Sequence, residues 1–417
     1  MSVHIFAARA GVACLAAIAA AGAAFAQAPP SDALSLDAAF ERALGDAPGL
    51  RAAEQARVGA EAGVQQADRA PNPTLDFGAE NFAGGKQYQS FDRAETTLSL
   101  SQRLEWGGDR VARTQLAAAE VAAARATGGV RRQDILHDVE MAYLAAQKAG
   151  AELQVALNRA ALAREIVETV DRRVKAARDP LLAGTRSRAL LAEAEIAVES
   201  ARQVERAAKA RLASFWGGDG DFSLDLALFE QPAIGSGAGE VASPELALAL
   251  AREGRAEAEI AVESARGSQD PTVSAGLRYF HETDEAALVV GVSIPLPLWD
   301  RNDGAVARAE AERSRLRYET EAIRRNIQRE ADTARSQMAI ARAEVEAIDA
   351  RLLPMADEAL AQARQGYNAG GFSYLDVLEA QRILVEARLQ RISALHSFHT
   401  ARVTLARLTG GYTAGAQ

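Results

Sequence analysis

The sequence predicts a mainly α-helical fold in which a unit of a short helix, two β-strands and a long helical hairpin occurs twice. The strands are expected to contribute to a small transmembrane β-barrel. Three observations predict this fold. Two proline-poor segments are far longer than ordinary helices, and short motifs recur about 200 residues apart. Four segments of about ten residues alternate between apolar and small or polar side chains, as barrel strands do.

The first residues predict export. Arg9 supplies a positive charge, a small and apolar run extends from Gly11 to Ala24, and Ala24-Phe25-Ala26 has the small-x-small pattern of a signal-peptidase site. We expect residues 1–26 to be a signal peptide, cleaved between Ala26 and Gln27. The apolar run is too short to cross a bilayer permanently as a helix, which takes roughly 20 residues.

The only cysteine, Cys14, lies inside this segment. It is either a lipid-attachment residue or an apolar filler of the signal core. Gly11-Val12-Ala13 lacks the leucine that lipoprotein cleavage sites usually carry, so the sequence favours the filler and leaves lipidation as the alternative.

Composition narrows the class of protein. Apolar residues make up 48% of the chain but aromatic residues only 5%, and alanine is abundant, which favours closely packed helices over a thick core. A net charge of −9 does not support nucleic-acid binding. Beyond the signal, no apolar stretch is long enough for a transmembrane helix, so entry into a membrane would require a barrel.

The first repeat is expected to cover residues 27–216, with its helical hairpin at about 106–216. Apolar residues spaced by three and four predict one helix from Trp106 to Ala177, roughly 100 Å long at 1.5 Å per residue. Gly128-Gly129 would weaken this helix locally without ending it. Arg178-Asp179-Pro180 ends the helix, and a return helix is expected from Arg186 to Trp216.

The second repeat is expected to cover residues 244–417, with its helical hairpin at about 302–408. A long helix from Asn302 to Tyr367 should be kinked at Pro354. A glycine-containing turn follows, and the return helix is expected from Ser373 to Leu408. Residues 217–243 are rich in Gly, Asp, Ser and Pro and are expected to link the two repeats.

Matching motifs support the duplication. Pro73-Thr74-Leu75 matches Pro271-Thr272-Val273, and Pro48-Gly49-Leu50 matches Pro244-Glu245-Leu246. Self-similarity over about 200 residues indicates a duplicated domain, since solenoid repeats are much shorter.

The four alternating segments are the expected strands, at residues 73–82, 96–105, 271–280 and 286–295. Trp106 and Trp299 follow two of them, where aromatic residues of a membrane interface belong. The alternative is that the four segments form two half-buried hairpins of a soluble protein, and each segment taken alone would fit that alternative. Four such segments in an exported, duplicated chain favour the barrel.

Four strands cannot close a barrel, because the smallest natural ones use about eight. The barrel must therefore be shared, with eight strands in a dimer or twelve in a trimer. Long hairpins must also bury their apolar stripes against neighbours. A ring of helices that continues a ring of strands makes a duct.

Three motifs carry a resemblance to a known family: Ala70-Pro71-Asn72-Pro73, Val292 to Leu296, and Gly366-Tyr367 followed by Gly370, Ser373 and Leu375 to Gln381. With them the chain resembles TolC-type outer-membrane factors, and among these the CzcC-like branch that serves heavy-metal efflux. The resemblance implies a homotrimer with a twelve-stranded barrel in outer-membrane lipid that continues into a periplasmic α-helical tunnel. The tunnel would dock on a membrane-fusion adaptor and, through it, on an inner-membrane pump of the RND type.

The resemblance also implies a periplasmic gate. Asp376 and Glu379 match acidic aperture positions, whose three copies would form carboxylate rings that favour cations. Tyr367 matches a tyrosine that helps to hold the gate shut. The sequence departs from some relatives at Phe372, which replaces an arginine, and at Arg186, which replaces an acid. A solvated helix face is the alternative for each carboxylate.

The turns of the two hairpins are the expected docking surface for the adaptor, because small residues there permit close approach. The residues assigned to it are Pro180, Gly184, Gly370, Gly371 and Leu375.

Metal, cofactor and enzyme sites are not predicted. His281, Glu282, Asp284 and Glu285 fit a solvated loop, and His396 and His399 fit a helix face, with too few ligands for a dedicated metal site. The sequence has no Gly-rich phosphate loop, nucleophile elbow or His-Glu-x-x-His. The alternatives to metal efflux are multidrug efflux or type I secretion, and, in another class, an exported coiled-coil scaffold or adaptor.

Overall fold

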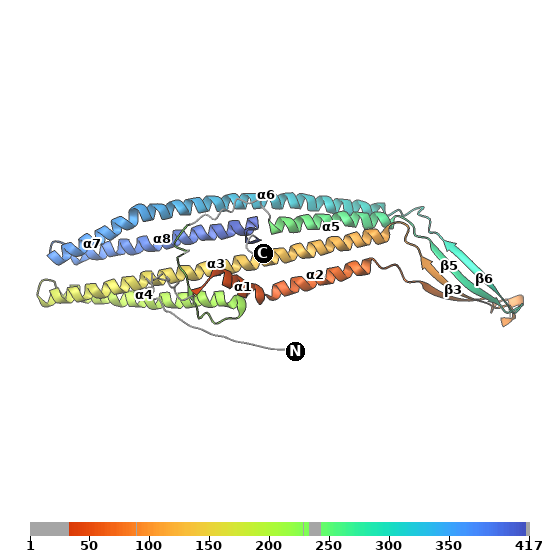
Figure 1. The fold of residues 1–417 in the computed structure, drawn as a ribbon, viewed down its shortest axis with the longest axis horizontal. Coiled ribbons are helices and arrows are strands. Elements are labelled where there is room, and N and C mark those ends of the chain that lie inside the picture. Colours follow the sequence, from red (N-terminus) through yellow and green to blue (C-terminus); the bar gives the residue numbers. More distant parts are fainter. Residues whose placement is uncertain (1–32, 89, 228, 233–242, 414–417) are drawn as a thin grey trace, which may run out of the picture.

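The computed structural model describes residues 33–88, 90–227, 229–232 and 243–413. The chain forms a long rod with a β-sheet at one end and the turns of two helical hairpins at the other (Figure 1). The predicted cleavage site between Ala26 and Gln27, and Cys14, lie outside the described residues.

The first half of the rod contains α1 (Leu36–Gly45), α2 (Pro48–Ala67), β2 (Thr74–Glu80), β3 (Glu95–Arg103), α3 (Asp109–Lys175) and α4 (Leu181–Ala213). The second half contains α5 (Pro244–Arg266), β5 (Thr272–Phe280), β6 (Glu285–Ser293), α6 (Asp303–Ala347), α7 (Leu353–Ala369) and α8 (Tyr374–Thr409). β1 (Ala33–Leu34), which precedes α1, pairs in parallel with β4 (Ser223–Leu224), which lies between the two halves. The predicted duplicated order of helix, β-hairpin and long helical hairpin is therefore confirmed.

Backbone details repeat as well. Gly108 and Asn302 precede α3 and α6, and both have positive φ, 84° and 64°. Gly217 and Gly410 follow the two return helices with φ of 69° and 72°. These left-handed positions suit glycine and asparagine, which adopt them at little cost. The two halves thus begin and end their hairpins by the same local chemistry.

The first hairpin differs from the expectation in its return helix. α3 runs unbroken for 67 residues through Gly128-Gly129. α4 begins at Leu181, five residues before Arg186, because Pro180 has the extended conformation of an N-cap and the helix starts directly after it. Gly184, assigned above to the turn, is consequently the fourth residue of α4.

The second hairpin bends where Pro354 predicts a kink. A π-helical turn, Ile348–Leu352, separates α6 from α7. Pro354 has no N–H for the carbonyl of Ala350, and its ring would clash with that carbonyl in a regular α-helix. The wider turn relieves this conflict, and the two helices lie at an angle (Figure 1).

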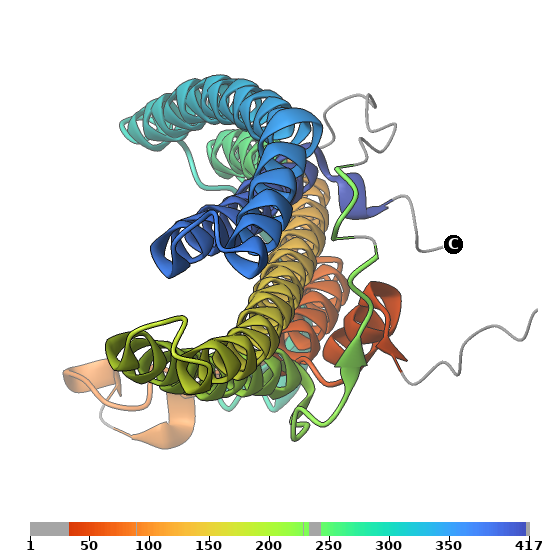
Figure 2. The ribbon, with the colours of Figure 1, turned by 90° about the vertical axis from the view of Figure 1, so that its left-hand side faces the viewer.

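The helices pack in pairs along the rod. α3 packs against α2, α4, α5 and α8, and α8 packs against α6 and α7. At the helical end, one apolar cluster joins α3, α7 and α8 through residues such as Val170, Leu360 and Val377. Viewed along the rod, the helices follow an arc that one chain does not close (Figure 2).

None of the helices in the described part of the chain combines the length and the apolar character needed to cross a bilayer as a helix.

Candidate functional site

The four-stranded sheet has its apolar side chains on the outside. Its order is β2-β3-β5-β6, with every neighbouring pair antiparallel. The register places the predicted apolar residues in rows across one face, for example Phe77, Leu98, Leu277 and Leu288. Phe77 and Leu288 are each 72% exposed. An exposed apolar face of this kind fits lipid.

The other face of the sheet is polar and internally paired. Arg278 on β5 forms ion pairs with Glu95 at 3.0 Å and Glu80 at 3.6 Å, and its Nε donates to Thr97 Oγ1 at 3.0 Å. Ser101 Oγ donates to Asp76 Oδ2 at 2.7 Å. The strands therefore alternate apolar-out and polar-in, which is the pattern of a barrel wall.

The outer strands β2 and β6 each have one edge that pairs with no strand in the described part of the chain. Unpaired edges expose backbone donors and acceptors, which is tolerable in lipid only when another strand covers them. The sheet therefore leaves two strand edges, on β2 and β6, with which another strand could pair.

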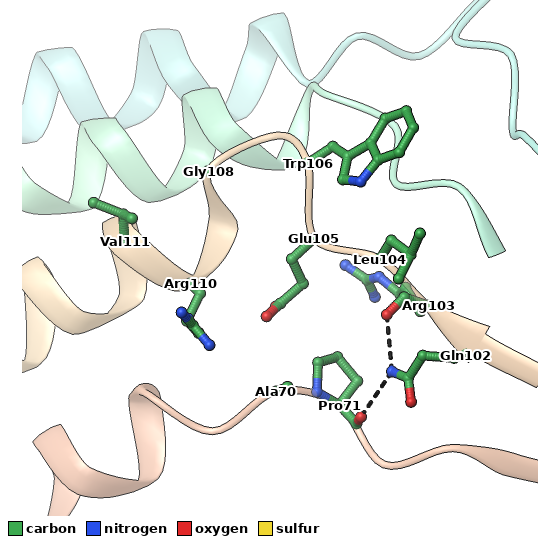
Figure 3. A pocket seen from close by; sticks show the side chains of 10 residues that line it. All are labelled: Ala70, Pro71, Gln102, Arg103, Leu104, Glu105, Trp106, Gly108, Arg110 and Val111. Atoms are coloured by element: carbon green, nitrogen blue, oxygen red, sulfur yellow. Dashed lines mark hydrogen bonds between the residues drawn. The ribbon is translucent and has the colours of Figure 1, made fainter. Parts of the chain in front are cut away.

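The sheet joins the helices through a polar junction. Asp270 accepts hydrogen bonds from the backbone N–H of Trp106 at 3.0 Å and of Gly107 at 3.3 Å, and pairs with Arg103 at 2.9 Å. Gln102 Nε2 donates to the carbonyl of Pro71 at 3.0 Å, which ties the two connections of the first repeat together (Figure 3). These contacts fix the direction of the sheet relative to the rod.

Tryptophans stand at this junction. Trp106 is 76% and Trp299 93% exposed, and Trp106 borders an open hollow that Arg103, Glu105 and Arg110 also line (Figure 3). Indoles at the end of an apolar band match the aromatic belts of membrane barrels.

At the opposite end, Tyr367, Asp179 and Arg173 form a cluster that we call the latch. The Tyr367 hydroxyl donates to Asp179 Oδ2. Arg173 donates through Nε to Asp179 Oδ2 at 2.9 Å and through a terminal nitrogen to the Tyr367 carbonyl at 2.7 Å. Its guanidinium also lies 4.4 Å from the centre of the Tyr367 ring. The latch joins the turn of the first hairpin to the end of α7.

The electrostatics of the latch keep each partner in its bonding form. Hydrogen bonds from Arg173, and also from Tyr367, lower the pKa of Asp179 against the opposing effect of burial. Burial and the Asp179 carboxylate raise the pKa of Tyr367. Asp179 is therefore a charged acceptor and Tyr367 a neutral donor, which makes a strong, charge-assisted hydrogen bond.

The structure brings only Tyr367 of the four predicted gate residues into the latch. Asp376 completes a capping box at the start of α8, accepting from the Ser373 N–H and hydroxyl, both at 2.8 Å. Glu379 is exposed and pairs with Arg382 at 2.7 Å. Arg186 is exposed on α4 and forms no ion pair with the described part of its own chain.

The turn of the second hairpin depends on its glycines. Gly370 has a φ of 86°, which ends α7 in the left-handed conformation. The ring of Phe372 lies so close over Gly366 that any side chain there would displace it. Phe372, the departure noted in the sequence, thus braces the turn and takes no part in the latch.

The predicted docking residues do not all lie on the surface. Pro180, Gly370, Gly371 and Leu375 are exposed at the tips, and Leu375 is 57% exposed. Gly184 is buried, and a Cβ there would meet Asp171 at 3.5 Å and Val174 at 3.8 Å, because the early start of α4 turns this position toward α3. Its assignment to the docking surface is therefore corrected.

Two exposed leucines at the first tip were missed. Leu181 is 82% and Leu182 68% exposed. Leu182 and Leu375 are each the second residue of a return helix, so the two tips present equivalent apolar side chains. The signal was present in the sequence as two leucines directly after a helix-starting proline.

The histidines make internal contacts. His281 packs edge-on against Tyr279 at 4.9 Å, and Glu282 pairs with Arg93 at 3.1 Å. His399 is buried, with Nε2 2.9 Å from the carbonyl of Phe229. Within the described ranges, no group of three or more His, Cys, Asp or Glu side chains is arranged to hold a metal ion.

Comparison with known proteins identifies relatives over almost the whole chain. Residues 39–218 and 240–411 match the family described as outer membrane efflux protein. The chain is 31% identical over 387 residues to the cobalt-zinc-cadmium resistance protein CzcC of Cupriavidus metallidurans, covering 90% of each chain. It is 29% identical over 320 residues to the nickel-cobalt-cadmium resistance protein NccC of Alcaligenes xylosoxydans xylosoxydans, covering 72% of this chain and 70% of that one.

Solved structures share the fold at lower identity. CusC superimposes with a TM-score of 0.74 at 18% identity, covering 90% of this chain and 91% of the other. VceC of Vibrio cholerae superimposes with a TM-score of 0.73 at 21% identity, covering 90% and 96%.

Proposed function

The chain belongs to the outer membrane efflux protein family, and from that premise we propose that it is the outer-membrane duct of a tripartite system that exports heavy-metal cations. It is a channel component and not an enzyme. The observation that carries the proposal is the sheet with its apolar face outward, continued by helical hairpins that form an open arc.

Three copies would complete the duct. Three sheets provide twelve strands, and pairing β2 of one copy with β6 of the next would leave no free edge. The same assembly closes the arc of helices into a tunnel. A dimer would provide eight strands, but eight-stranded barrels are filled by side chains and leave no channel.

The latch is proposed to hold the periplasmic aperture narrow, since it ties the first hairpin to the second at their tips. Asp376 and Glu379 are exposed near the same end, where three copies would place carboxylates around the aperture. Arg186, exposed on α4, is proposed to belong to the same aperture.

The tips are proposed to dock on a periplasmic adaptor, which connects the duct to an inner-membrane pump of the RND type. Leu182 and Leu375 supply apolar contacts, and Pro180, Gly370 and Gly371 allow close approach. Equivalent leucines on both hairpins suit a partner that contacts both in the same way.

Metals are favoured as cargo because CzcC and NccC, which resemble this chain over most of its length, are metal resistance proteins by name. Multidrug efflux or protein secretion is the second candidate, because the fold is shared with channels at 18–21% identity whose cargo the fold does not specify. The scaffold alternative is disfavoured, since a scaffold in water has no use for an exposed apolar sheet.

The test is export in cells. We would delete the gene and measure resistance and accumulation for cobalt, zinc, cadmium, nickel, copper and silver, beside dyes and antibiotics. Wild-type protein should restore resistance to a subset of metals, whereas Leu182→Asp with Leu375→Asp should not, although it reaches the membrane. Sensitivity confined to dyes and antibiotics would overturn metal cargo, and normal export of everything would overturn the duct.

A further inference from the structure

The bend between α6 and α7 is locked by a contact from α8. α8 runs past the π-helical turn Ile348–Leu352 without a break. Arg391 of α8 donates through Nε to Asp349, which lies on that turn, at 2.6 Å. The Arg391 side chain is 23% exposed and the Asp349 side chain 41% exposed, so solvent screens the pair only in part.

Arg391 also contacts the segment that follows β4 and lies against α3 and α8. We call residues 225–227 and 229–230 the strap. A second nitrogen of Arg391 donates to the carbonyl of Glu230 at 3.4 Å, and His399, two turns further along α8, contacts the carbonyl of Phe229 at 2.9 Å. Gln147 of α3 donates to the carbonyl of Asp225 at 2.6 Å. The strap thus ties α3 to α8 beside the bend.

Apolar packing holds the strap in the same place. The side chain of Phe229 is only 1% exposed and packs in one cluster with Leu144 of α3, Val345 of α6 and Leu395 of α8. Val345 lies three residues before the π-helical turn. Removing the strap would therefore open a cavity next to the bend, and the bend and the strap form one mechanical unit.

The bend has the properties of a hinge. A π-helical turn has poorer hydrogen-bond geometry than an α-helix and occurs often at functional sites, and Pro354 prevents α6 and α7 from fusing into one regular helix. Beyond the turn, α7 carries Tyr367 of the latch. A change of angle at the turn moves Tyr367 relative to Asp179 on the other hairpin.

We propose that the π-helical turn Ile348–Leu352 is the hinge at which α7 changes its angle to α6, and that Arg391 of α8 is a positioning residue that fixes this angle by joining Asp349 to the strap. The proposal rests on the proposed function in one respect, the assignment of the tip as the gate. While the Arg391 contacts hold, α7 keeps the direction that aligns the latch. When they break, α7 turns at Ile348–Leu352 and Tyr367 moves away from Asp179.

The test measures the tip directly. Cysteines replace Arg178 and Ala369, which are exposed on the two tips. Cys14, the only native cysteine, is replaced by serine when the mature chain retains it. Spin labels at 178 and 369 report the distance between the hairpins by double electron–electron resonance in the full chain reconstituted in lipid, and planar-bilayer recordings report conductance.

Arg391→Ala should increase the population of the wider distance roughly two- to fivefold, as expected for loss of an ion pair, and raise conductance. Asp349→Arg with Arg391→Asp restores the ion pair in reverse but not the hydrogen bond to the Glu230 carbonyl, and should therefore return the distance part of the way to the wild-type value. Arg388→Ala is the matched control, because Arg388 pairs with Asp357 at 3.4 Å on the tip side of the turn, where both partners move together. It should leave the distance unchanged.

The hinge is overturned when Arg391→Ala keeps the wild-type distance and conductance, or when the reversed pair gives the same distance as Arg391→Ala while circular dichroism shows an intact fold. Tyr367→Phe separates this result from the gate. If the distance between the tips increases in Tyr367→Phe but not in Arg391→Ala, the hinge proposal is wrong and the gate proposal stands. If the distance stays at the wild-type value in both variants, the hinge proposal and the gate proposal are both wrong.

Discussion

At the scale of single residues, the latch shows what a sequence can and cannot reveal. Tyr367 was predicted for the gate from a motif, but Asp179 was recognised only as a residue of a turn, and Arg173 was not singled out. The latch residues Asp179 and Tyr367 lie 188 positions apart. Local patterns carry no information on such a pairing, because it depends on how two hairpins are packed.

The latch predicts a defined effect of removing one oxygen. Tyr367→Phe deletes the hydrogen bond to Asp179, which at a charged acceptor contributes about 1.5–3 kcal/mol. We expect higher single-channel conductance and an unchanged fold. Tyr374→Phe is the control, since Tyr374 is also buried and its ring centre lies 6.1 Å from that of Tyr367 in a tilted arrangement. Its hydroxyl forms no hydrogen bond within the described part of the chain. Equal conductance in the two variants would contradict the latch.

His399 predicts a pH dependence. Burial lowers its pKa, the Phe229 carbonyl acts to raise it, and Arg402 and His396 act to lower it further. The folded state therefore binds fewer protons than the unfolded state, whose histidine pKa is about 6.5. Stability is fully present above that pH and is lost as pH falls through the folded-state pKa.

The measurement is the melting temperature from pH 8 to pH 5. The free energy of unfolding of the wild type should fall by up to about 1.4 kcal/mol per pH unit below the unfolded-state pKa, and its melting temperature should fall with it. Both should fall less in His399→Gln. His396, whose pKa is lowered by burial and then by Lys148, contributes with the same sign, so it stays unchanged in both proteins. Parallel profiles would show that His399 does not titrate in this range.

At the scale of elements, the strands were predicted within two residues at each end. Their period of two is simple, and one residue of slip would reverse both faces. The return helix from Pro180 was misplaced by five residues, because Gly184 was taken as part of the turn. Gly184 is tolerated inside α4, since it packs against α3, and this contact is invisible in the local sequence.

The sheet predicts opposite results for neighbouring residues of β6. Leu288→Arg puts a charge on the outward apolar face and should cost about 2–4 kcal/mol near the middle of a bilayer. Val289→Arg puts the same charge on the polar face, in the row that contains Asp76, and should be nearly neutral. Urea unfolding in lipid vesicles measures the difference. Equal destabilisation by both variants would rule out lipid on the outward face.

At the scale of the whole molecule, the strand pattern indicated that the chain is incomplete alone and left two copies or three open, and the family resemblance implied three. The structure shows the incompleteness as free edges of β2 and β6 and as an open arc of helices. The family was recognised from motifs at the hairpin and the tip, and the comparisons confirm it. The number of copies depends on angles between copies, which no local pattern encodes.

The proposed assembly predicts a mass. Native mass spectrometry of protein released from outer-membrane lipid should show three chains, and heating should convert that species to one chain on a gel. A species of two chains would contradict the twelve-stranded barrel, and a single chain would leave the edges of the sheet without a partner.

The outward apolar face of the sheet also constrains how the protein reaches and enters the membrane. In water its leucines and valines have nothing to pack on, and the hydrophobic effect would drive them together across chains. The helices carry the buried clusters and can form before the sheet meets lipid. The apolar face of the strands must therefore be shielded from water between export and membrane insertion. The newly exported chain depends on a chaperone to cover the surface that lipid covers in the finished duct.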